Sequence, residues 1–219
     1  MAIAGLPDFW ASDFATGTAE QLDVAFADGS TASLDADSAI AVDFTDKTRR
    51  IKLLRGRAYF DVAKDMQRPF VVEAASGVTT ALGTRFAVHE WDGTVTIAVE
   101  ESAVSVVAPN RSTVRIGVGQ NVSYGEDGMG AIGGVDLASE MAWRRGKLIF
   151  EDKPLRQVVA DVNRYRKGTI KVTDRRLNDL RISGIFDIRD PEGVLDAIAA
   201  ALPVRLTRLT DYLILVRPA

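Results

Sequence analysis

The chain has 219 residues, of which 47% are hydrophobic and 26% charged, a balance typical of a soluble globular protein with one large or two modest domains. Its 27 Lys and Arg against 30 Asp and Glu give a formal net charge of -3, so no overall field attracts a nucleic-acid backbone, and nucleic acid is not an expected partner. The absence of cysteine excludes disulfides, iron–sulfur clusters and thiolate zinc sites.

The sequence carries no recognisable signal for membrane insertion or export. No apolar run reaches the roughly 20 residues that span a bilayer, and residues Met1–Gly5 lack the basic start and apolar core of a signal peptide. We therefore expect that the chain itself is not embedded in a membrane.

The first part of the chain has the pattern of short β-strands. Between Asp28 and Gly130, apolar runs rich in β-branched and aromatic residues alternate with Gly, Pro and Asp-Gly turn signals, and no stretch requires a helix. We predict strands at Ile51–Leu54, Ala58–Val62 and Phe70–Glu73, with a turn at Gly56 between the first two.

The clearest hairpin is predicted at Asp92-Gly93. A two-residue primed turn needs positive φ at both positions, which these residue types tolerate. After the turn, Val95, Ile97 and Val99 alternate with smaller or polar residues, so one face of this strand is predicted to be core. The alternation continues in later strands, which favours a sandwich or roll of short antiparallel strands.

A Gly-rich segment, residues 125–134, leads into a region with a different pattern. Strand, helix and strand follow one another twice, first around a helix that begins near Pro154 and then around one that begins at Asp190-Pro191 and stops at Pro203. We predict an all-β domain at residues 1–138 and a small α+β domain of two βαβ units with an extra edge strand at residues 139–219.

Four phrases of the first domain resemble, in order, the periplasmic domain of FecR-family sigma-factor regulators. They are DGSTASLDADSAIAVDF (residues 28–44), LLRGRAYFDVA (53–63), RPFVVEA (68–74) and LGTRFAV (82–88). The second domain resembles the STN domain, a double-βαβ module of secretins, of signalling TonB-dependent receptors and of the C-terminus of many FecR-type regulators. The order of the two domains matches the last of these.

The resemblance implies a regulator that passes a signal across the cell envelope. In the family, an outer-membrane TonB-dependent receptor senses a ferric siderophore or similar ligand, and its N-terminal signalling domain contacts the C-terminal periplasmic part of the regulator. Regulated cleavage by periplasmic proteases then frees or activates an extracytoplasmic-function sigma factor. Full-length members also have a membrane helix and a cytoplasmic segment that holds the sigma factor. The resemblance therefore implies a periplasmic fragment of a single-pass inner-membrane protein, anti-sigma factor or activator, with sigma-factor binding in the missing segment.

The Gly83-Thr84 bond is the candidate site of chemistry. A threonine hydroxyl can attack the preceding carbonyl in an N-to-O acyl shift, which leaves an ester that water cleaves, when the backbone is strained and the oxyanion is stabilised. The resemblance points the same way, because some FecR-type regulators are processed at a Gly-Thr bond. The alternative is that Gly83 permits a bulge or close packing and that Thr84 is an ordinary strand residue.

Other catalytic groups are sparse in the sequence. His89 is the only histidine, and no G-x-S-x-G elbow occurs. We expect no metal, no cofactor and no enzyme activity beyond a single-turnover cleavage at Gly83-Thr84.

The last two predicted strands, residues 204–216, form the candidate partner site. A strand at a sheet edge offers unpaired N–H and C=O groups to a strand of a partner. We expect this edge to bind the signalling domain of the receptor through Arg205, Leu206, Arg208, Tyr212 and Leu213, with the polar members setting specificity. The alternative is that this hairpin only completes the core.

Two other functional classes stay open. A carbohydrate-binding or hydrolytic β-domain needs paired carboxylates, but the adjacent Glu100 and Glu101 point to opposite faces of a strand and cannot share a substrate. A structural secretin-like module would need oligomerisation and an outer-membrane segment.

Overall fold

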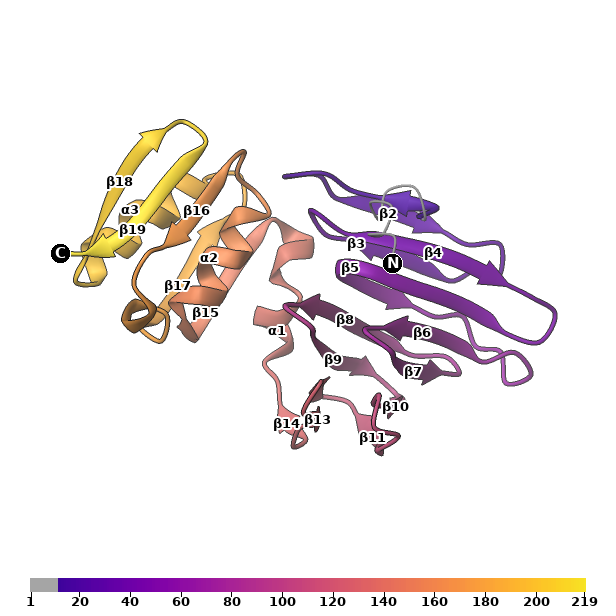
Figure 1. Ribbon diagram of the computed structural model, residues 1–219. Coiled ribbons are helices and arrows are strands. Elements are labelled where there is room, and N and C mark those ends of the chain that lie inside the picture. Colours follow the sequence, from indigo (N-terminus) through magenta and orange to yellow (C-terminus); the bar gives the residue numbers. More distant parts are fainter. Residues whose placement is uncertain (1–11) are drawn as a thin grey trace, which may run out of the picture. The chain divides into compact units, whose positions relative to one another are not determined.

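The computed structural model describes residues 12–219, and the chain divides between Leu137 and Ala138 into two compact units (Figure 1). We call residues 12–137 the β-unit and residues 138–219 the αβ-unit. Met1–Gly5, which we interpreted as lacking a signal peptide, lies outside the described residues.

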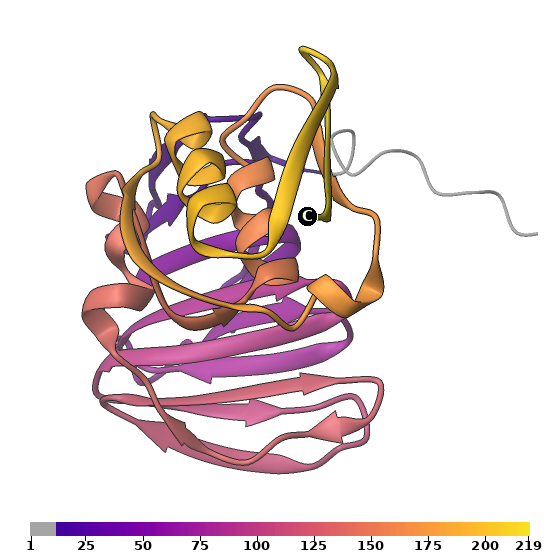
Figure 2. The same cartoon turned by 90° about the vertical axis from the view of Figure 1, so that its left-hand side faces the viewer.

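The β-unit consists of strands that form one curled sheet, with the neighbour order β11-β10-β7-β6-β5-β8-β9-β12-β13 (Figure 2). Strands β1 and β4 continue from one half of β5, and strands β2 and β3 from the other half. The bounds of the strands are β1 Phe14–Ala15, β2 Leu22–Ala25, β3 Thr31–Leu34, β4 Ala39–Phe44, β5 Arg49–Asp61, β6 Phe70–Ala74, β7 Gly77–Ala81, β8 Arg85–Trp91, β9 Thr94–Glu101, β10 Ala103–Val107, β11 Thr113–Gly117, β12 Gln120–Gly125, β13 Gly128–Met129 and β14 Gly133–Gly134.

Strand β5 is the longest element and joins the two halves of the sheet. Its first half pairs with β4 and β6, and its second half pairs with β3 and β8. The predicted turn at Gly56 is wrong, because Gly56 has φ +86° and bends the strand without ending it. A Cβ atom at Gly56 would lie 2.4 Å from Ser38 Oγ and 2.5 Å from the carbonyl oxygen of Asp37, so only glycine fits this bend.

One pair of strands departs from the predicted antiparallel arrangement. Strands β5 and β6 run parallel, with Arg49 opposite Phe70. A parallel pair needs a connection that crosses over, and residues 62–69 provide it. This crossover, residues 62–69, positions the candidate site described below.

The core of the β-unit is a single cluster that takes residues from both halves of the sheet. The predicted alternation on β9 is confirmed, because Val95, Ile97 and Val99 are all fully buried in this cluster. A row of aromatic rings crosses the cluster, with centroids 5.4 to 6.5 Å apart along Phe44, Phe26, Phe70, Phe60 and Phe86.

The predicted Asp92-Gly93 hairpin is also confirmed. The two residues have φ +52° and +74° and connect β8 to β9, with Trp91 directly opposite Thr94. Positive φ at both central positions is the geometry of a type I′ turn.

The αβ-unit contains the predicted order of strand, helix and strand, repeated once, which confirms an all-β domain followed by a small α+β domain. Its two longer helices, α2 (Leu155–Asn163) and α3 (Pro191–Ala201), contact the strands on either side of them in the sequence (Figure 1). The bounds are α1 Leu137–Glu140, the 3₁₀ turn η2 Ala142–Arg145, β15 Lys147–Pro154, α2 Leu155–Asn163, β16 Thr169–Val172, the 3₁₀ turn η3 Arg175–Leu177, β17 Arg181–Asp187, α3 Pro191–Ala201, β18 Val204–Thr210 and β19 Leu213–Pro218.

The strands of the αβ-unit pair across the two repeats and not within them. Strand β15 pairs antiparallel with β17, while β16, β19 and β18 form a three-stranded sheet in that order. The last strand, β19, therefore lies between β16 and β18, whereas the sequence suggested that it would lie at an edge. The edge of the C-terminal hairpin is β18.

The start of α3 that the sequence predicted is confirmed. Asp190 is its N-cap, accepting a hydrogen bond from the Gly193 amide at 2.9 Å, and Pro191 is the first helical residue. Pro154 differs slightly, since it ends β15 and occupies the N-cap position of α2.

Candidate functional site

The Gly83-Thr84 bond lies in the short connection between β7 and β8, where the crossover packs against it. The Asp65 amide donates to the carbonyl oxygen of Leu82 at 3.2 Å, and the Val62 amide donates to the carbonyl oxygen of Thr84 at 3.0 Å. One backbone hydrogen bond therefore holds the chain on each side of the Gly83-Thr84 bond.

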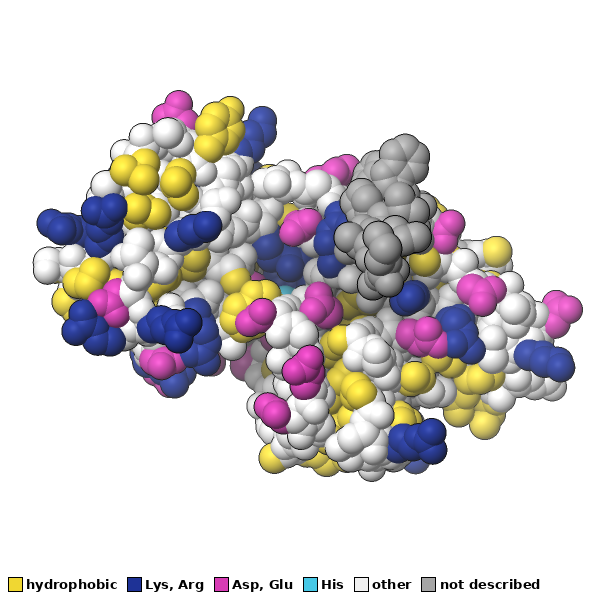
Figure 3. Space-filling view, in the orientation of Figure 1, with side chains coloured by type: hydrophobic (Ala, Val, Ile, Leu, Met, Phe, Trp, Pro, Cys, Tyr) yellow, Lys and Arg dark blue, Asp and Glu magenta, His cyan; other side chains and the backbone are white. Residues whose placement is uncertain are grey.

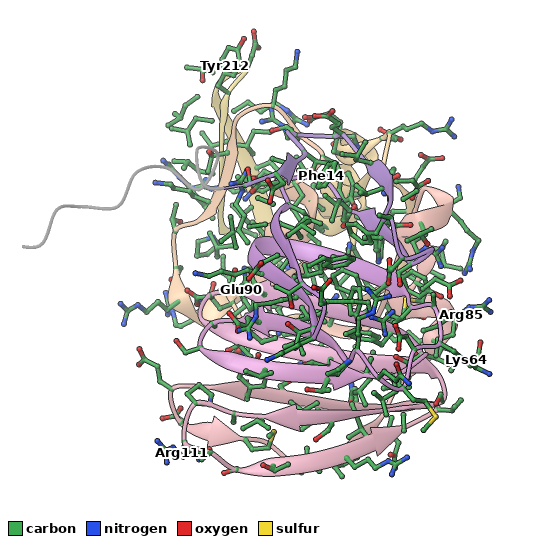
Figure 4. The ribbon with its side chains drawn as sticks, turned by 90° about the vertical axis from the view of Figure 1, so that its right-hand side faces the viewer. Phe14, Lys64, Arg85, Glu90, Arg111 and Tyr212 are labelled. Atoms are coloured by element: carbon green, nitrogen blue, oxygen red, sulfur yellow. The ribbon has the colours of Figure 1, made fainter. Side chains whose placement is uncertain are left out.

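Gly83 adopts a backbone conformation that other residues rarely take. Its φ is +146°, and a Cβ atom at this position would lie 2.4 Å from Cγ and 3.0 Å from Cα of Lys64. Lys64 belongs to the crossover, and Figure 4 shows it at the same edge of the β-unit as Arg85. The crossover thus forces a glycine here, because any other residue would be strained in this conformation and would clash with Lys64.

The hydroxyl of Thr84 is buried without a hydrogen-bond partner. The residue is 3% exposed, and among the residues that the structure describes no group donates to or accepts from its Oγ1. A buried hydroxyl is nearly always satisfied, and leaving one unpaired costs about 1–3 kcal/mol. This hydroxyl is the atom that an N-to-O acyl shift would use.

The side chain of Arg85, which follows Thr84, is engaged in ion pairs with two carboxylates. Its guanidinium forms ion pairs with Asp61 at 3.0 Å and with Glu101 at 3.3 Å, on an exposed part of β8. The hydrogen bond from Arg85 to Asp61, together with the nearby charge of Glu101, raises the pKa of Arg85. These pairs give Arg85 the role of a surface ion pair and not of an oxyanion donor.

The residues of the candidate partner site divide between the two faces of the C-terminal sheet. Arg208 extends towards α3, where its Nη2 lies 3.0 Å from a carboxylate oxygen of Glu192 and 3.5 Å from one of Asp196. Leu206 stands opposite the fully buried Val216 on the same side. Arg205, by contrast, stands opposite Arg217, one position along from these residues and therefore on the other face.

The remaining two residues of this site lie at the turn of the hairpin. Tyr212 is 67% exposed, and Figure 4 shows it at the tip of the hairpin. Leu213 is the first residue of the central strand β19. The structure therefore does not bring Arg205, Arg208 and Tyr212 to one surface.

The carboxylates considered for a hydrolytic site engage different partners. Glu100 accepts a hydrogen bond from the Tyr59 hydroxyl, while Glu101 pairs with Arg85. Within residues 12–219, no three His, Asp or Glu side chains gather in a way that would hold a metal ion. None of the helices in that range is long and apolar enough to cross a lipid bilayer.

Comparison with known proteins places the candidate site within a family. Residues 12–105 match the model of the FecR protein family, and this range includes the Gly83-Thr84 bond and the crossover that packs against it. The β-unit of this chain belongs to the FecR family. No curated protein matches the chain. The FecR match ends before the αβ-unit, so the resemblance of that unit to the STN domain stays a prediction.

Two crystal structures show the same fold over both units. Both are described as a "putative anti-sigma factor" from Parabacteroides distasonis ATCC 8503. One is 24% identical to this chain with a TM-score of 0.84, and the other is 25% identical with a TM-score of 0.83. In each case the alignment covers 94% of this chain and 98% of the other.

One residue that shapes the candidate site of the β-unit, Arg49, was not singled out from the sequence. Arg49 is fully buried, and its Nε donates to the carbonyl oxygen of Arg68 at 2.9 Å while its Nη1 donates to that of Ala63 at 2.9 Å. It thus holds both ends of the crossover that packs against Gly83. The sequence pattern could have indicated this burial, because Arg49 lies two residues before Ile51 and four before Leu53 and therefore on the same face of the strand as these core residues.

Proposed function

We propose that this FecR-family chain is the periplasmic signalling part of an anti-sigma regulator of an extracytoplasmic-function sigma factor. In this proposal the αβ-unit binds the N-terminal signalling domain of an outer-membrane TonB-dependent receptor, and the regulator relays the availability of a siderophore. The sigma factor contacts a cytoplasmic segment of the parent protein, and periplasmic proteases act on the regulator after the signal. The observation that carries the proposal is the FecR match of residues 12–105, together with a fold shared with anti-sigma factor candidates.

The unpaired edge of β18 supports the proposal that the αβ-unit binds the receptor. Among the described residues β18 pairs only with β19, so one side of its backbone offers free N–H and C=O groups. A signalling domain with an edge strand of its own can add to it and continue the sheet.

Hydrogen–deuterium exchange of the chain, alone and with the purified signalling domain of a candidate receptor, tests this mode of binding. Amides of Val204–Thr210 should gain protection on binding, while those of β16, at the other edge of the same sheet, serve as the matched control and should not change. Protection confined to β16, or to β15 and β17, would contradict strand addition at β18. No binding to any receptor domain would contradict the receptor role itself.

A second activity, self-cleavage at Gly83-Thr84, is favoured by the closely packed glycine and the unpartnered hydroxyl. In the proposed reaction, Thr84 Oγ1 attacks the carbonyl carbon of Gly83, and its proton passes to the amide nitrogen. The carbon–nitrogen bond then breaks, which leaves an ester to Oγ1 and a free amine on Thr84. Water adds to the ester and divides it into the Gly83 carboxylate and the restored Thr84 hydroxyl.

The backbone hydrogen bonds at Leu82 and Thr84 support the first step, because they restrict the motion of the peptide that the buried hydroxyl would attack. The two fragments, residues 1–83 and 84–219, would remain associated. Strand β5 of the first fragment pairs with β8 of the second over residues Gly56–Asp61, and β7 pairs with β10. The core cluster also contains residues from both fragments.

The cleavage is tested by the intact mass of the purified chain under denaturing conditions, after incubation at neutral pH. Wild type should give two masses that meet at Gly83-Thr84. Thr84→Ser keeps a hydroxyl and should also cleave, whereas Thr84→Ala should stay whole, and Thr80→Ala on the neighbouring strand β7 serves as a matched control that cleaves. A single uncleaved mass for wild type would contradict the acyl shift and would not affect the proposed receptor role.

A further inference from the structure

The two units of the chain carry opposite charge. Residues 138–219 contain 16 Lys and Arg against 11 Asp and Glu, while residues 1–137 contain 11 against 19. The net charge of -3 for the whole chain hides this division. The αβ-unit is therefore a basic unit, and the position of its cations decides what it can bind.

One face of the three-stranded sheet of the αβ-unit is covered by helices, and the other is open. On the covered side, Ile170, Ile214 and Val216 are buried, and α2 and α3 contact the strands. On the open side, Lys171 stands beside Leu215, and the exposed Arg205 stands opposite Arg217. We call Lys171, Arg205, Leu213, Leu215 and Arg217 the basic sheet face.

The three cations of the basic sheet face have no acidic partner of their own. Among the described residues, none of the three takes part in an ion pair or a side-chain hydrogen bond. Several other cations of this unit are paired, as Arg208 and Arg166 are with Glu192. Like charges directly opposite on neighbouring strands are destabilising, so the fold gains nothing from the Arg205–Arg217 juxtaposition.

The face also has an apolar part. Leu213 and Leu215 lie on the central strand, half-buried, with cations on the strands to either side or further along. Figure 3 looks onto these strands and shows hydrophobic and basic side chains gathered over them. An apolar centre with a polar rim that includes arginine is the composition of a protein interface.

From these observations we infer that the basic sheet face binds an acidic protein surface, with carboxylates opposite Lys171, Arg205 and Arg217 and apolar side chains against Leu213 and Leu215. The partner is the receptor signalling domain, so the inference rests on the proposed function and names the chemistry of its partner. Strand addition at β18 would bring that domain to the border of this face, because Arg205 belongs to β18 itself.

A membrane surface fits the same face less well. Recognition of anionic lipid typically takes a cluster of about 4–8 Lys and Arg near the surface, and this face has three cations around leucines. The same shortage applies to a nucleic-acid backbone, whose binding grows with the number of phosphates that are neutralised.

Charge reversal on the face tests the inference. Lys171→Glu, Arg205→Glu and Arg217→Glu should each weaken binding to the receptor signalling domain by about tenfold, measured by titration calorimetry at low salt, and raised salt should reduce the wild-type affinity more than that of the variants. Arg189→Glu is the matched control, since Arg189 is exposed, lies outside this sheet between β17 and α3, and changes the net charge equally.

A folding measurement separates lost binding from lost structure. Arg205→Glu replaces a like-charge pair with an opposite-charge pair across to Arg217, so its Tm should equal or exceed that of wild type while its affinity falls. Unchanged affinity in all three variants, with wild type binding normally, would overturn the inference and leave the proposed function standing. A wild type that binds no receptor domain would overturn both.

Two further results would also overturn it. Flotation of the chain with phosphatidylglycerol vesicles that is lost in the reversed variants would assign the face to the membrane. Sedimentation showing a wild-type oligomer that the same variants dissociate would assign it to a second copy of this chain, whose acidic β-unit could supply the carboxylates.

Discussion

Arg49 and Asp28 form an ion pair inside the FecR unit, with 2.8 Å between Nη1 and the carboxylate and with side chains that are 0% and 4% exposed. The guanidinium also lies over the Phe70 ring, 5.5 Å from its centroid, and holds the crossover through backbone carbonyls. Removing two charges from water costs several kcal/mol each, so the loss of one partner leaves an uncompensated buried charge and strongly destabilises the fold. The buried pair thus links the turn after β2 to the crossover that packs against Gly83.

Loss of the buried carboxylate should destabilise the β-unit strongly. Asp28→Ala leaves the Arg49 charge buried and uncompensated and removes the hydrogen bonds from the amide and hydroxyl of Ser30, so the free energy of unfolding should fall by about 3–5 kcal/mol. The control is Glu73→Ala, which breaks the partly exposed pair with Arg50 and should cost about 1 kcal/mol or less. Urea unfolding, with hydrogen exchange of β5 amides as the local reporter, measures both. Equal losses would contradict a special role for the buried pair.

The same carboxylate should give the β-unit an acid-sensitive stability. Burial opposes ionisation of Asp28, but hydrogen bonds from Ser30 and Arg49 outweigh it and hold the pKa of Asp28 below its ordinary value of 3.8. A lowered folded-state pKa stabilises the protein above pH 3.8, and that stabilisation is lost as the pH falls through the folded-state pKa.

Urea midpoints of wild type and Asp28→Asn, compared from pH 7 down to pH about 2, check this dependence. The stability advantage of wild type should be constant near neutral pH and shrink only below pH 3.8. An advantage that shrank already between pH 7 and pH 5 would implicate a different group.

Local features of the fold were predictable from the sequence, whereas long-range ones were not. The Asp92-Gly93 turn and the alternation after it depend on neighbouring residues alone, and the N-cap at Asp190 does too. The continuity of β5 depends on Ser38, which lies 19 residues from Arg57 and bridges its amide and carbonyl groups through one hydroxyl. No local pattern carries that information.

The candidate sites show the same limit. Residue chemistry alone singled out Gly83-Thr84, but the close approach of Lys64 to Gly83 and the burial of the hydroxyl depend on tertiary packing, which the sequence did not reveal. In the C-terminal hairpin, Arg205 and Arg208 were grouped although their odd spacing places them on opposite faces of a strand. The Arg205–Arg217 pairing required the register between β18 and β19.

The bend in β5 should reject any side chain. Gly56→Ala forces a residue into φ +86° and places its Cβ against Ser38 Oγ and a backbone oxygen, so we expect a loss of about 3–5 kcal/mol. Gly93→Ala is the matched control, because Gly93 also has positive φ but no atom within 4 Å of the added Cβ, and it should cost about 1–2 kcal/mol. Chemical denaturation measures the difference, and similar losses would show that the close approach to Ser38 relaxes freely.

Replacing the Thr84 hydroxyl should make the β-unit more stable while abolishing cleavage. Thr84→Val keeps the shape and removes a buried hydroxyl without a partner, so the free energy of unfolding should rise by about 1–3 kcal/mol relative to uncleaved wild type. Thr16 is the matched control: it is equally buried, but its hydroxyl donates to the carbonyl oxygen of Asp35 at 2.6 Å and accepts from the Ser38 amide at 2.9 Å.

Thr16→Val should therefore lower the free energy of unfolding by a similar amount, so the two substitutions are expected to have opposite signs. Denaturation curves, with intact mass confirming that each sample is uncleaved, decide the matter. A destabilised Thr84→Val protein would mean that the hydroxyl serves the fold, and the argument for a hydroxyl kept for chemistry would lose its support. A stabilised one would show that the FecR unit retains at Thr84 a group that its own stability disfavours.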